Sequence, residues 1–229
     1  MPAVKFDETT QVKWRILIYG APGVGKTTTA STLKGKTYLL SLDDSFHRVD
    51  AFRGKDIWSI DPDKPIEDLA DFVRSFDPSK YDNLIVDNLS NLQKLWFVEM
   101  AKQTQNGLDN KIQHYGEFTN YVIRFIAKIF SYDLNIFLTA WESQSEVTNA
   151  AGQTFRQYGP DIRANARDYL MGNCDVVGRM VVKPKTGERG FILLGDDGTY
   201  AKNRLDDRKG CKAEDLINFN NSLMNSGGK

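Results

Sequence analysis

The sequence has few of the residues from which metal sites and disulfides are built. It contains 229 residues but only 2 cysteines and 2 histidines. Cys174 and Cys211 are far apart in the chain without a histidine nearby, and His47 and His114 form no ligand cluster. Zinc sites and disulfides need closely spaced or paired residues of these types. The sequence therefore predicts two reduced structural thiols and argues against a zinc-binding or disulfide-stabilised protein.

Long hydrophobic runs are also missing. No stretch approaches the roughly 20 uncharged apolar residues that cross a bilayer. The start, MPAVKFDETTQ, lacks the apolar core of a secretory signal. With 41% hydrophobic and 26% charged residues, the composition is ordinary for a soluble globular protein. We therefore expect a cytoplasmic protein that has no membrane partner.

An excess of positive charge is absent too, because 30 basic residues balance 30 acidic ones. A protein that coats DNA through its whole surface is usually basic, so this balance argues against such a protein. The charge is uneven, however. Residues 56–99 contain ten acidic and four basic residues, whereas residues 179–212 contain nine basic and five acidic ones. The second segment is either a local anion-binding edge or simply a solvated face.

The apolar pattern alternates between strand-like and helix-like segments. Short apolar runs predict strands at residues 14–19, 37–42, 56–60, 84–86 and 135–140, with a strand pair at 175–182 and 190–194. Helical periodicity predicts helices at residues 25–33, 65–76, 89–100, 118–130, 162–171 and 213–224. Polar composition predicts loops at residues 106–114 and 142–160, the second of them long and mobile.

This alternation indicates a three-layer α/β fold. We expect a mainly parallel sheet with helices on both faces and a C-terminal β-hairpin that extends the sheet. The length suits one such domain with a hydrophobic core. We place it at residues 14–224, after a lead-in at 1–13 and before a flexible tail at 225–229.

The most specific motif lies directly after the first expected strand. GAPGVGKT, residues 20–27, matches G-x-x-x-x-G-K-[ST] at every fixed position. In such a loop the glycines let backbone N–H groups surround a phosphate, the lysine reaches the β- and γ-phosphates, and the hydroxyl holds Mg²⁺. We call residues 20–27 the cradle. The residues expected to bind the nucleotide are Gly20, Pro22, Gly23, Val24, Gly25, Lys26, Thr27 and Thr28.

A second motif completes the expected metal site. The apolar run at residues 84–86 ends at Asp87, as in a Walker B strand that delivers a carboxylate to Mg²⁺. Thr27 and Asp87 are thus the expected metal ligands. The next residue is Asn88, at a place where many AAA-type ATPases carry their catalytic base, so the base must come from elsewhere.

Four segments in order resemble one family. GAPGVGKTT, YDNLIVDN, FLTAWE and TYAKNR are together similar to the phage-encoded P-loop proteins of the RecA-like class, and the resemblance covers residues 14–212. These small proteins are thought to act in recombination as single-strand annealing proteins. The resemblance implies a RecA-like ATPase core in the bacterial host cytoplasm, with ATP and Mg²⁺ as its cofactors.

The resemblance also assigns catalytic roles. RecA-like proteins carry a catalytic glutamate at the end of the strand after the P-loop helix, where this chain has Asp43 and Asp44. Asp43 is the first candidate for polarising water beside Lys26, although either aspartate could instead terminate a strand. Glu142 stands where such proteins sense the γ-phosphate, and it either positions water, as a third candidate base, or relays the nucleotide state to the following loop. Lys202 and Arg204 resemble the basic motif that reaches a neighbouring subunit's nucleotide, or are two exposed cations.

The same resemblance places single-stranded DNA on the segment after Trp141. That segment contains Phe155, Arg156 and Tyr158, and aromatic and Arg side chains are suited to stacking on bases and binding phosphates. An ordinary surface loop can contain the same residues.

The expected function is therefore an oligomeric, ATP-hydrolysing recombination protein that anneals or pairs single-stranded DNA. Its expected partners are single-stranded DNA, further copies of the chain and a single-stranded DNA-binding protein. Three alternatives stay open: an AAA-type helicase loader or replication ATPase, a small-molecule P-loop kinase, and a non-catalytic module that is gated by nucleotide.

Overall fold

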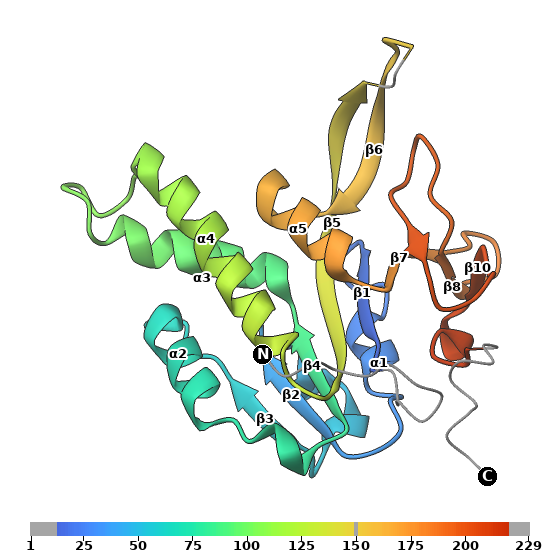
Figure 1. Ribbon diagram of the computed structural model, residues 1–229, viewed down its shortest axis with the longest axis horizontal. Coiled ribbons are helices and arrows are strands. Elements are labelled where there is room, and N and C mark those ends of the chain that lie inside the picture. Colours follow the sequence, from blue (N-terminus) through green and yellow to red (C-terminus); the bar gives the residue numbers. More distant parts are fainter. Residues whose placement is uncertain (1–12, 149–150, 220–229) are drawn as a thin grey trace, which may run out of the picture.

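The computed structural model describes residues 13–148 and 151–219. Within these residues ten strands form one sheet in the order β10-β8-β7-β1-β5-β4-β2-β3, with β6 paired to β5 and β9 paired to β7 (Figure 1). The strands are β1 (Arg15–Gly20), β2 (Thr37–Ser41), β3 (Asp56–Ser59), β4 (Asn83–Asp87), β5 (Asn135–Thr148), β6 (Thr154–Pro160), β7 (Val176–Val182), β8 (Arg189–Ile192), β9 (Lys202–Asn203) and β10 (Gly210–Lys212).

Helices connect most of these strands. The α-helices in the described part of the chain are α1 (Lys26–Ala30), α2 (Pro65–Ser75), α3 (Leu89–Ala101), α4 (Ile112–Ile129) and α5 (Ala164–Asn173). Short 3-10 turns are η1 (Ser45–Arg48), η2 (Asp50–Phe52), η3 (Pro78–Lys80) and η4 (Ala213–Asp215). None of the described helices is long and apolar enough to span a bilayer.

The sheet confirms the expected mainly parallel α/β fold. Strands β3, β2, β4, β5, β1 and β7 are neighbours in parallel pairs. β8 then runs antiparallel to β7, and β10 antiparallel to β8, so the predicted C-terminal strand pair does extend the sheet. The central strands are buried on both faces, which explains why they appear in the sequence as continuous apolar runs.

Two hydrophobic cores lie on opposite faces of the sheet. Leu17 and Tyr19 of β1 pack with residues of α2, α3, α4 and α5, whereas Ile16 and Ile18 pack in a smaller core with Ala30 of α1. The coverage is therefore unequal, with four helices on one face and the short α1 on the other (Figure 1). Each fully buried Leu, Ile or Phe contributes about 1.5–3 kcal/mol to such a core.

The segment predicted as a long mobile loop at residues 142–160 is instead a β-hairpin. β5 continues to Thr148 and pairs antiparallel with β6, from Glu142 opposite Pro160 to Thr148 opposite Thr154. Figure 1 shows this pair rising away from the rest of the sheet. We call residues 142–148 and 154–160 the hairpin arm. The loop prediction was wrong because the Ser, Thr and Gln side chains that suggested a loop sit on paired strands.

Two helix predictions also need correction. The helix predicted at residues 25–33 ends at Ala30, because the Ser31 and Thr32 hydroxyls bond back to the carbonyls of Thr28 and Thr29, each at 2.8 Å. The described part of the helix predicted at 213–224 contains only η4 and turns. There the Arg208 guanidinium donates hydrogen bonds to the carbonyls of residues 215 and 216, at 2.7 and 3.2 Å. Residues 1–12 and 220–229, with the predicted tail, lie outside the described part of the chain.

Candidate nucleotide site

The carboxyl ends of the central parallel strands bring the expected site residues together. β1 ends at Gly20, which is in register with Trp141 of β5. β4 ends at Asp87, in register with Ser41 at the end of β2. The edge formed by carboxyl ends of parallel strands is where open α/β sheets bind ligands. The cradle, Asp87 and the start of the hairpin arm therefore share this edge.

The cradle has the backbone that a phosphate loop requires. Gly23 and Gly25 have φ angles of 78° and 108°, which residues other than glycine rarely adopt. The Lys26 side chain is only 6% exposed and its Nζ donates to the carbonyls of Gly20 at 2.9 Å and Ala21 at 3.0 Å. Burial lowers the pKa of Lys26, and the carboxylates of Asp87, Asp43 and Glu142 oppose that shift. The ammonium is thus held at the loop, where phosphate oxygens would be stronger partners than carbonyls.

Asp87 is the centre of a buried cluster of hydroxyls. Its Oδ2 accepts from Thr27 Oγ1 at 2.6 Å and from Ser45 Oγ at 3.3 Å, and its Oδ1 accepts from Thr139. The residue is 2% exposed, and burial, followed by the nearby Asp43 carboxylate, raises the pKa of Asp87. A raised pKa means that the ionised form is poorly compensated here, which a divalent cation would correct.

These residues fit Mg²⁺ with a nucleotide. Within the described residues no cluster of three His, Cys, Asp or Glu side chains could hold a metal by itself. Mg²⁺ typically takes one or two protein ligands and completes its shell with water and phosphate oxygens. Thr27 and Asp87 supply a hydroxyl and a carboxylate 2.6 Å apart beside the phosphate loop. When bound there, Mg²⁺ would neutralise charge on the phosphates.

Of the two candidate bases, the structure brings Asp43 to the site. Its carboxylate accepts from the Asn88 side chain and from the Ser45 backbone N–H at 3.1 Å. Asp44 has a left-handed φ of 56°, and its carboxylate bonds to Ser59 at the end of β3. The Asn88 amide was missed as a functional group, since the sequence identified it only as a residue other than glutamate.

Glu142 lies at the root of the hairpin arm and is held by a residue that the sequence did not single out. Arg179 of β7 donates to Glu142 Oε2 at 3.0 Å, and both side chains are mostly buried. The same guanidinium covers the ring of Tyr158 at 3.4 Å from its centroid. Nearby, the Tyr19 hydroxyl lies 3.0 and 2.6 Å from the carbonyl oxygens of Tyr158 and Tyr200. The cradle strand is thus joined directly to the base of the arm.

Comparison with known proteins gives the family of the chain. The model of a family described as "AAA domain" matches residues 12–205. The chain belongs to this AAA-domain family. Its fold is that of a P-loop NTPase, with a mostly parallel sheet and helices on both faces.

The similar solved structures have low sequence identity to this chain. The RadB recombinase has a TM-score of 0.49 and 12% identity, over 78% of this chain and 79% of that one. The flagellar accessory protein FlaH from Methanocaldococcus jannaschii has a TM-score of 0.47 and 11% identity, over 86% and 83% of the two chains. No curated protein sequence matches the chain.

Two expected residues of the AAA-domain protein lie away from its own cradle. β9 pairs with the first residues of β7, at Val176 and Val177, whereas the cradle follows the far end of β1. Lys202 Nζ donates to the carbonyls of Met171 at 2.6 Å and Gly172 at 3.2 Å, near the end of α5. Arg204 is exposed. Within one chain, therefore, neither cation is positioned at the nucleotide.

The three candidate DNA-binding residues are all on β6 but in different settings. Arg156 is exposed on the outer part of the arm, opposite Glu146, and the half-buried Phe155 lies opposite Val147. Tyr158 is nearer the base, where Arg179 already covers one face of its ring. Phe155 and Arg156 are thus the pair that the arm presents at a distance from the cradle.

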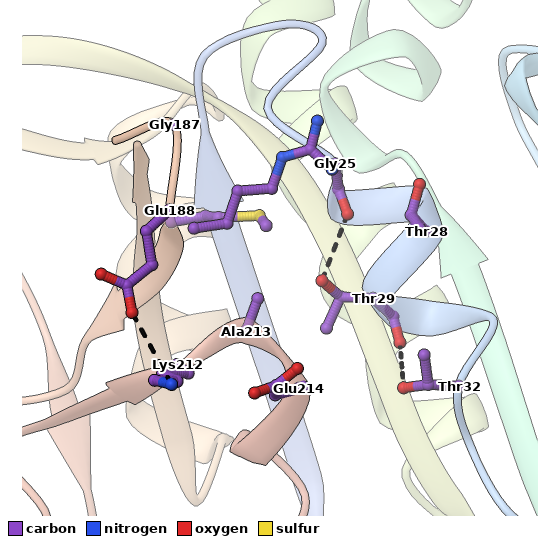
Figure 2. A pocket seen from close by; sticks show the side chains of 11 residues that line it. Gly25, Thr28, Thr29, Thr32, Gly187, Glu188, Lys212, Ala213 and Glu214 are labelled. Atoms are coloured by element: carbon purple, nitrogen blue, oxygen red, sulfur yellow. Dashed lines mark hydrogen bonds and ion pairs between the residues drawn. The ribbon is translucent and has the colours of Figure 1, made fainter. Parts of the chain in front are cut away.

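A cavity of about 390 Å³ opens beside the cradle (Figure 2). One wall is formed by Gly25 and the α1 residues Thr28 and Thr29, and the facing wall includes Lys212 and Glu214. This volume lies in the range of small-molecule sites, about 300–1,000 Å³. Because it begins at the cradle, the cavity is suited to the nucleoside part of a nucleotide whose phosphates occupy the loop.

Proposed function

We propose that this protein binds and hydrolyses ATP with Mg²⁺ and acts as an oligomer on single-stranded DNA, in annealing or strand pairing during phage recombination. The observation that carries the nucleotide part is the convergence of Lys26, Thr27 and Asp87 at one edge of the sheet. The DNA part is supported by the hairpin arm and its link to that edge.

Hydrolysis needs a group that takes a proton from the attacking water. Asp43 suits this role better than Glu142, because its described partners are only an amide and a backbone N–H, whereas Glu142 is engaged in an ion pair with Arg179. We assign to Asp43 the role of taking a proton from the attacking water, and Asn88 orients the Asp43 carboxylate. Glu142 then senses the nucleotide, since its own pair with Arg179 connects the site edge to the arm.

Single-stranded DNA would bind along the outer part of the arm. Phe155 offers a ring for stacking and Arg156 a cation for phosphate, which is the usual chemistry of sequence-tolerant binding. The arm joins the site at Glu142 of β5. A shift of this residue on nucleotide binding would therefore reach the DNA-contacting strand without an intermediate element.

Assembly would complete the catalytic site. Lys202 of β9 and Arg204, directly after it, lie away from their own cradle, but the exposed Arg204 can reach a neighbouring subunit. A positive charge supplied in this way stabilises the charge that develops on the departing phosphate. This arrangement would couple hydrolysis to oligomerisation.

Binding measurements with two ligands test the proposal. Wild-type protein should bind an ATP analogue and a fluorescent single strand, and the nucleotide should change the DNA affinity and the size of the assembly. The Lys26→Ala variant should lose the nucleotide effect. A wild-type protein that binds nucleotide but has no affinity for single strands, even at low salt, would contradict the recombination role and favour a loader or a kinase.

A further inference from the structure

Arg189 reaches the cradle from a distant strand. It begins β8, and the position that a β-carbon on Gly25 would occupy lies 3.2 Å from Arg189 Nη1 and 3.3 Å from its Cζ. Gly25 is the last glycine of the cradle, directly before Lys26. A guanidinium therefore covers the phosphate loop from within the same chain. A β-carbon at position 25 would crowd the guanidinium, and the φ of 108° is one that residues other than glycine rarely adopt.

The Arg189 guanidinium is also uncommitted. Within the described residues it forms no hydrogen bond or ion pair, although the acidic Glu188 precedes it. Glu188 instead pairs with Lys183 at 2.7 Å and Lys212 at 3.9 Å, and Figure 2 shows its carboxylate turned toward Lys212. Arg179, by contrast, is occupied by Glu142. Arg189 is thus a free cation beside a loop built for anions.

The position of Arg189 fixes which part of a nucleotide it would meet. Both Gly25 and Arg189 line the cavity beside α1. A nucleotide with its terminal phosphates at Lys26 and its nucleoside in the cavity must pass the guanidinium at the junction of the two. That junction is the α-phosphate. Arg side chains bind phosphate oxygens with paired N–H donors, so the geometry suits such a contact.

We propose that Arg189 is a clamp for the α-phosphate of the bound nucleoside triphosphate or diphosphate, acting within the same chain. The proposal rests on the proposed nucleotide binding and adds a residue to it. Because the clamp grips phosphate and not the base, its contribution should be the same for adenine and guanine nucleotides. It should also be equal for the triphosphate and the diphosphate, since both carry an α-phosphate.

Calorimetry on the wild type and four variants provides the test, with ADP, GDP and a non-hydrolysable ATP analogue as probes. The variants are Arg189→Gln, Arg189→Lys, Lys185→Gln and Lys26→Ala. Arg189→Gln should weaken all three by about tenfold, the size expected for one charge-assisted contact at a partly exposed site. Arg189→Lys should recover part of the loss. Lys185→Gln removes one charge from the turn between β7 and β8, at a residue that does not line the cavity, and should match the wild type. Thermal unfolding verifies that the variants are folded.

The failure of the clamp and the failure of nucleotide binding give different results. If the wild type binds and Lys26→Ala does not, while Arg189→Gln stays within twofold of the wild type, the clamp is overturned. A loss that differs between ADP and GDP would also overturn it, because it would place Arg189 on the base. A wild type that binds none of the probes would instead overturn the proposed function itself.

Discussion

The cradle and the hairpin arm meet at one edge of the sheet but are built in opposite ways. In the cradle region the charged groups are buried and hydrogen-bonded to neutral groups: Lys26 donates to loop carbonyls, and Asp87 accepts from three hydroxyls. In the outer arm, residues 146–148 and 154–156, the two described strands pair with each other, and Arg156 is exposed. The cradle region is therefore preorganised for a ligand, whereas the outer arm presents an exposed surface.

This difference separates two kinds of function. A preorganised, water-poor site strengthens electrostatic contacts with phosphates, as catalysis needs. An exposed strand with an aromatic and a cation can accept many sequences, as binding of single strands needs. The base of the arm belongs to neither region, because Tyr19 ties it to the cradle strand and Arg179 ties it to β7. Substitutions in each region should therefore weaken the direct contact with one ligand and leave the affinity for the other ligand alone unchanged.

The largest effect is expected from Lys26→Ala. The variant loses the ammonium that binds the terminal phosphates, so ATP affinity should fall about 100-fold or more and turnover should cease. The fold should persist, because alanine is well suited to a helical position and removes a buried charge. Calorimetry and thermal unfolding would measure both effects. An Ala variant that is folded and binds ATP like the wild type contradicts the assignment of the cradle.

The next effect concerns the exposed cation outside the cradle. Arg204→Ala should keep ATP affinity and lose turnover, by about a thousandfold if Arg204 acts as an arginine finger on a neighbour. Mixing it with Lys26→Ala should restore part of the rate, because some interfaces then pair an intact cradle with an intact Arg204. Phosphate release in the mixture measures this. Full activity of Arg204→Ala, or of a strictly monomeric protein, would remove the intersubunit role.

A smaller effect should separate the arm from the cradle. Replacing Phe155 and Arg156 by alanine should weaken single-stranded DNA binding by about 1–3 kcal/mol for each stacked base that is lost. The salt dependence of binding should also become shallower, since one phosphate contact is removed. ATP affinity should not change. Fluorescence anisotropy with Lys185→Gln as the control would show whether the loss is specific to the arm.

The smallest effect is on stability and has the opposite sign from the effect on function. Because the folded-state pKa of Asp87 is raised, its stabilising contribution is complete below the unfolded pKa and is lost as pH rises through the folded pKa. Asp87→Asn should therefore raise the Tm of the Mg²⁺-free protein at neutral pH, by about 2–4 °C per kcal/mol. The gain should shrink as pH falls through the raised folded-state pKa of Asp87, and Mg²⁺-dependent turnover should fall.

A Tm for Asp87→Asn below that of the wild type at neutral pH would contradict this electrostatic account. The hydroxyls of Thr27 and Thr139 can turn to accept hydrogen bonds from the new amide, so lost hydrogen bonding alone should not reverse the sign. The Asn variant thus tests whether the buried Asp87 carboxylate lowers the stability of the Mg²⁺-free protein while serving Mg²⁺ binding.

The features that depend on neighbouring residues could be predicted from the sequence. The features that depend on pairing between strands could not. The fold class and the cradle follow from apolar runs and an unbroken motif of eight residues, 20–27, and Asp87 follows from the end of an apolar strand. The arm was missed, since its Ser, Thr and Gln residues are typical of loops. The pairing of Val147 with Phe155 and of Ser145 with Gln157 is what makes them strands.

The two arginines show the same limit. Arg179 reaches Glu142 because β7 and β5 lie on either side of β1, and Arg189 reaches Gly25 because β8 lies beside β7. Nothing in the residues around either arginine indicates the partner. The roles of Asp43, Glu142, Phe155 and Arg204 stay predictions, because they concern a water, a nucleotide state, a DNA strand and a neighbouring subunit.

The most direct measurement is the rate of ATP turnover with and without single-stranded DNA, for the wild type and for the variant with Phe155 and Arg156 replaced by alanine. The wild-type rate should rise when DNA is added, and the variant should keep the basal rate but lose the rise. A wild-type rate that does not respond to DNA, or a variant that is stimulated as strongly as the wild type, would contradict the claim that the arm links DNA to this nucleotide site.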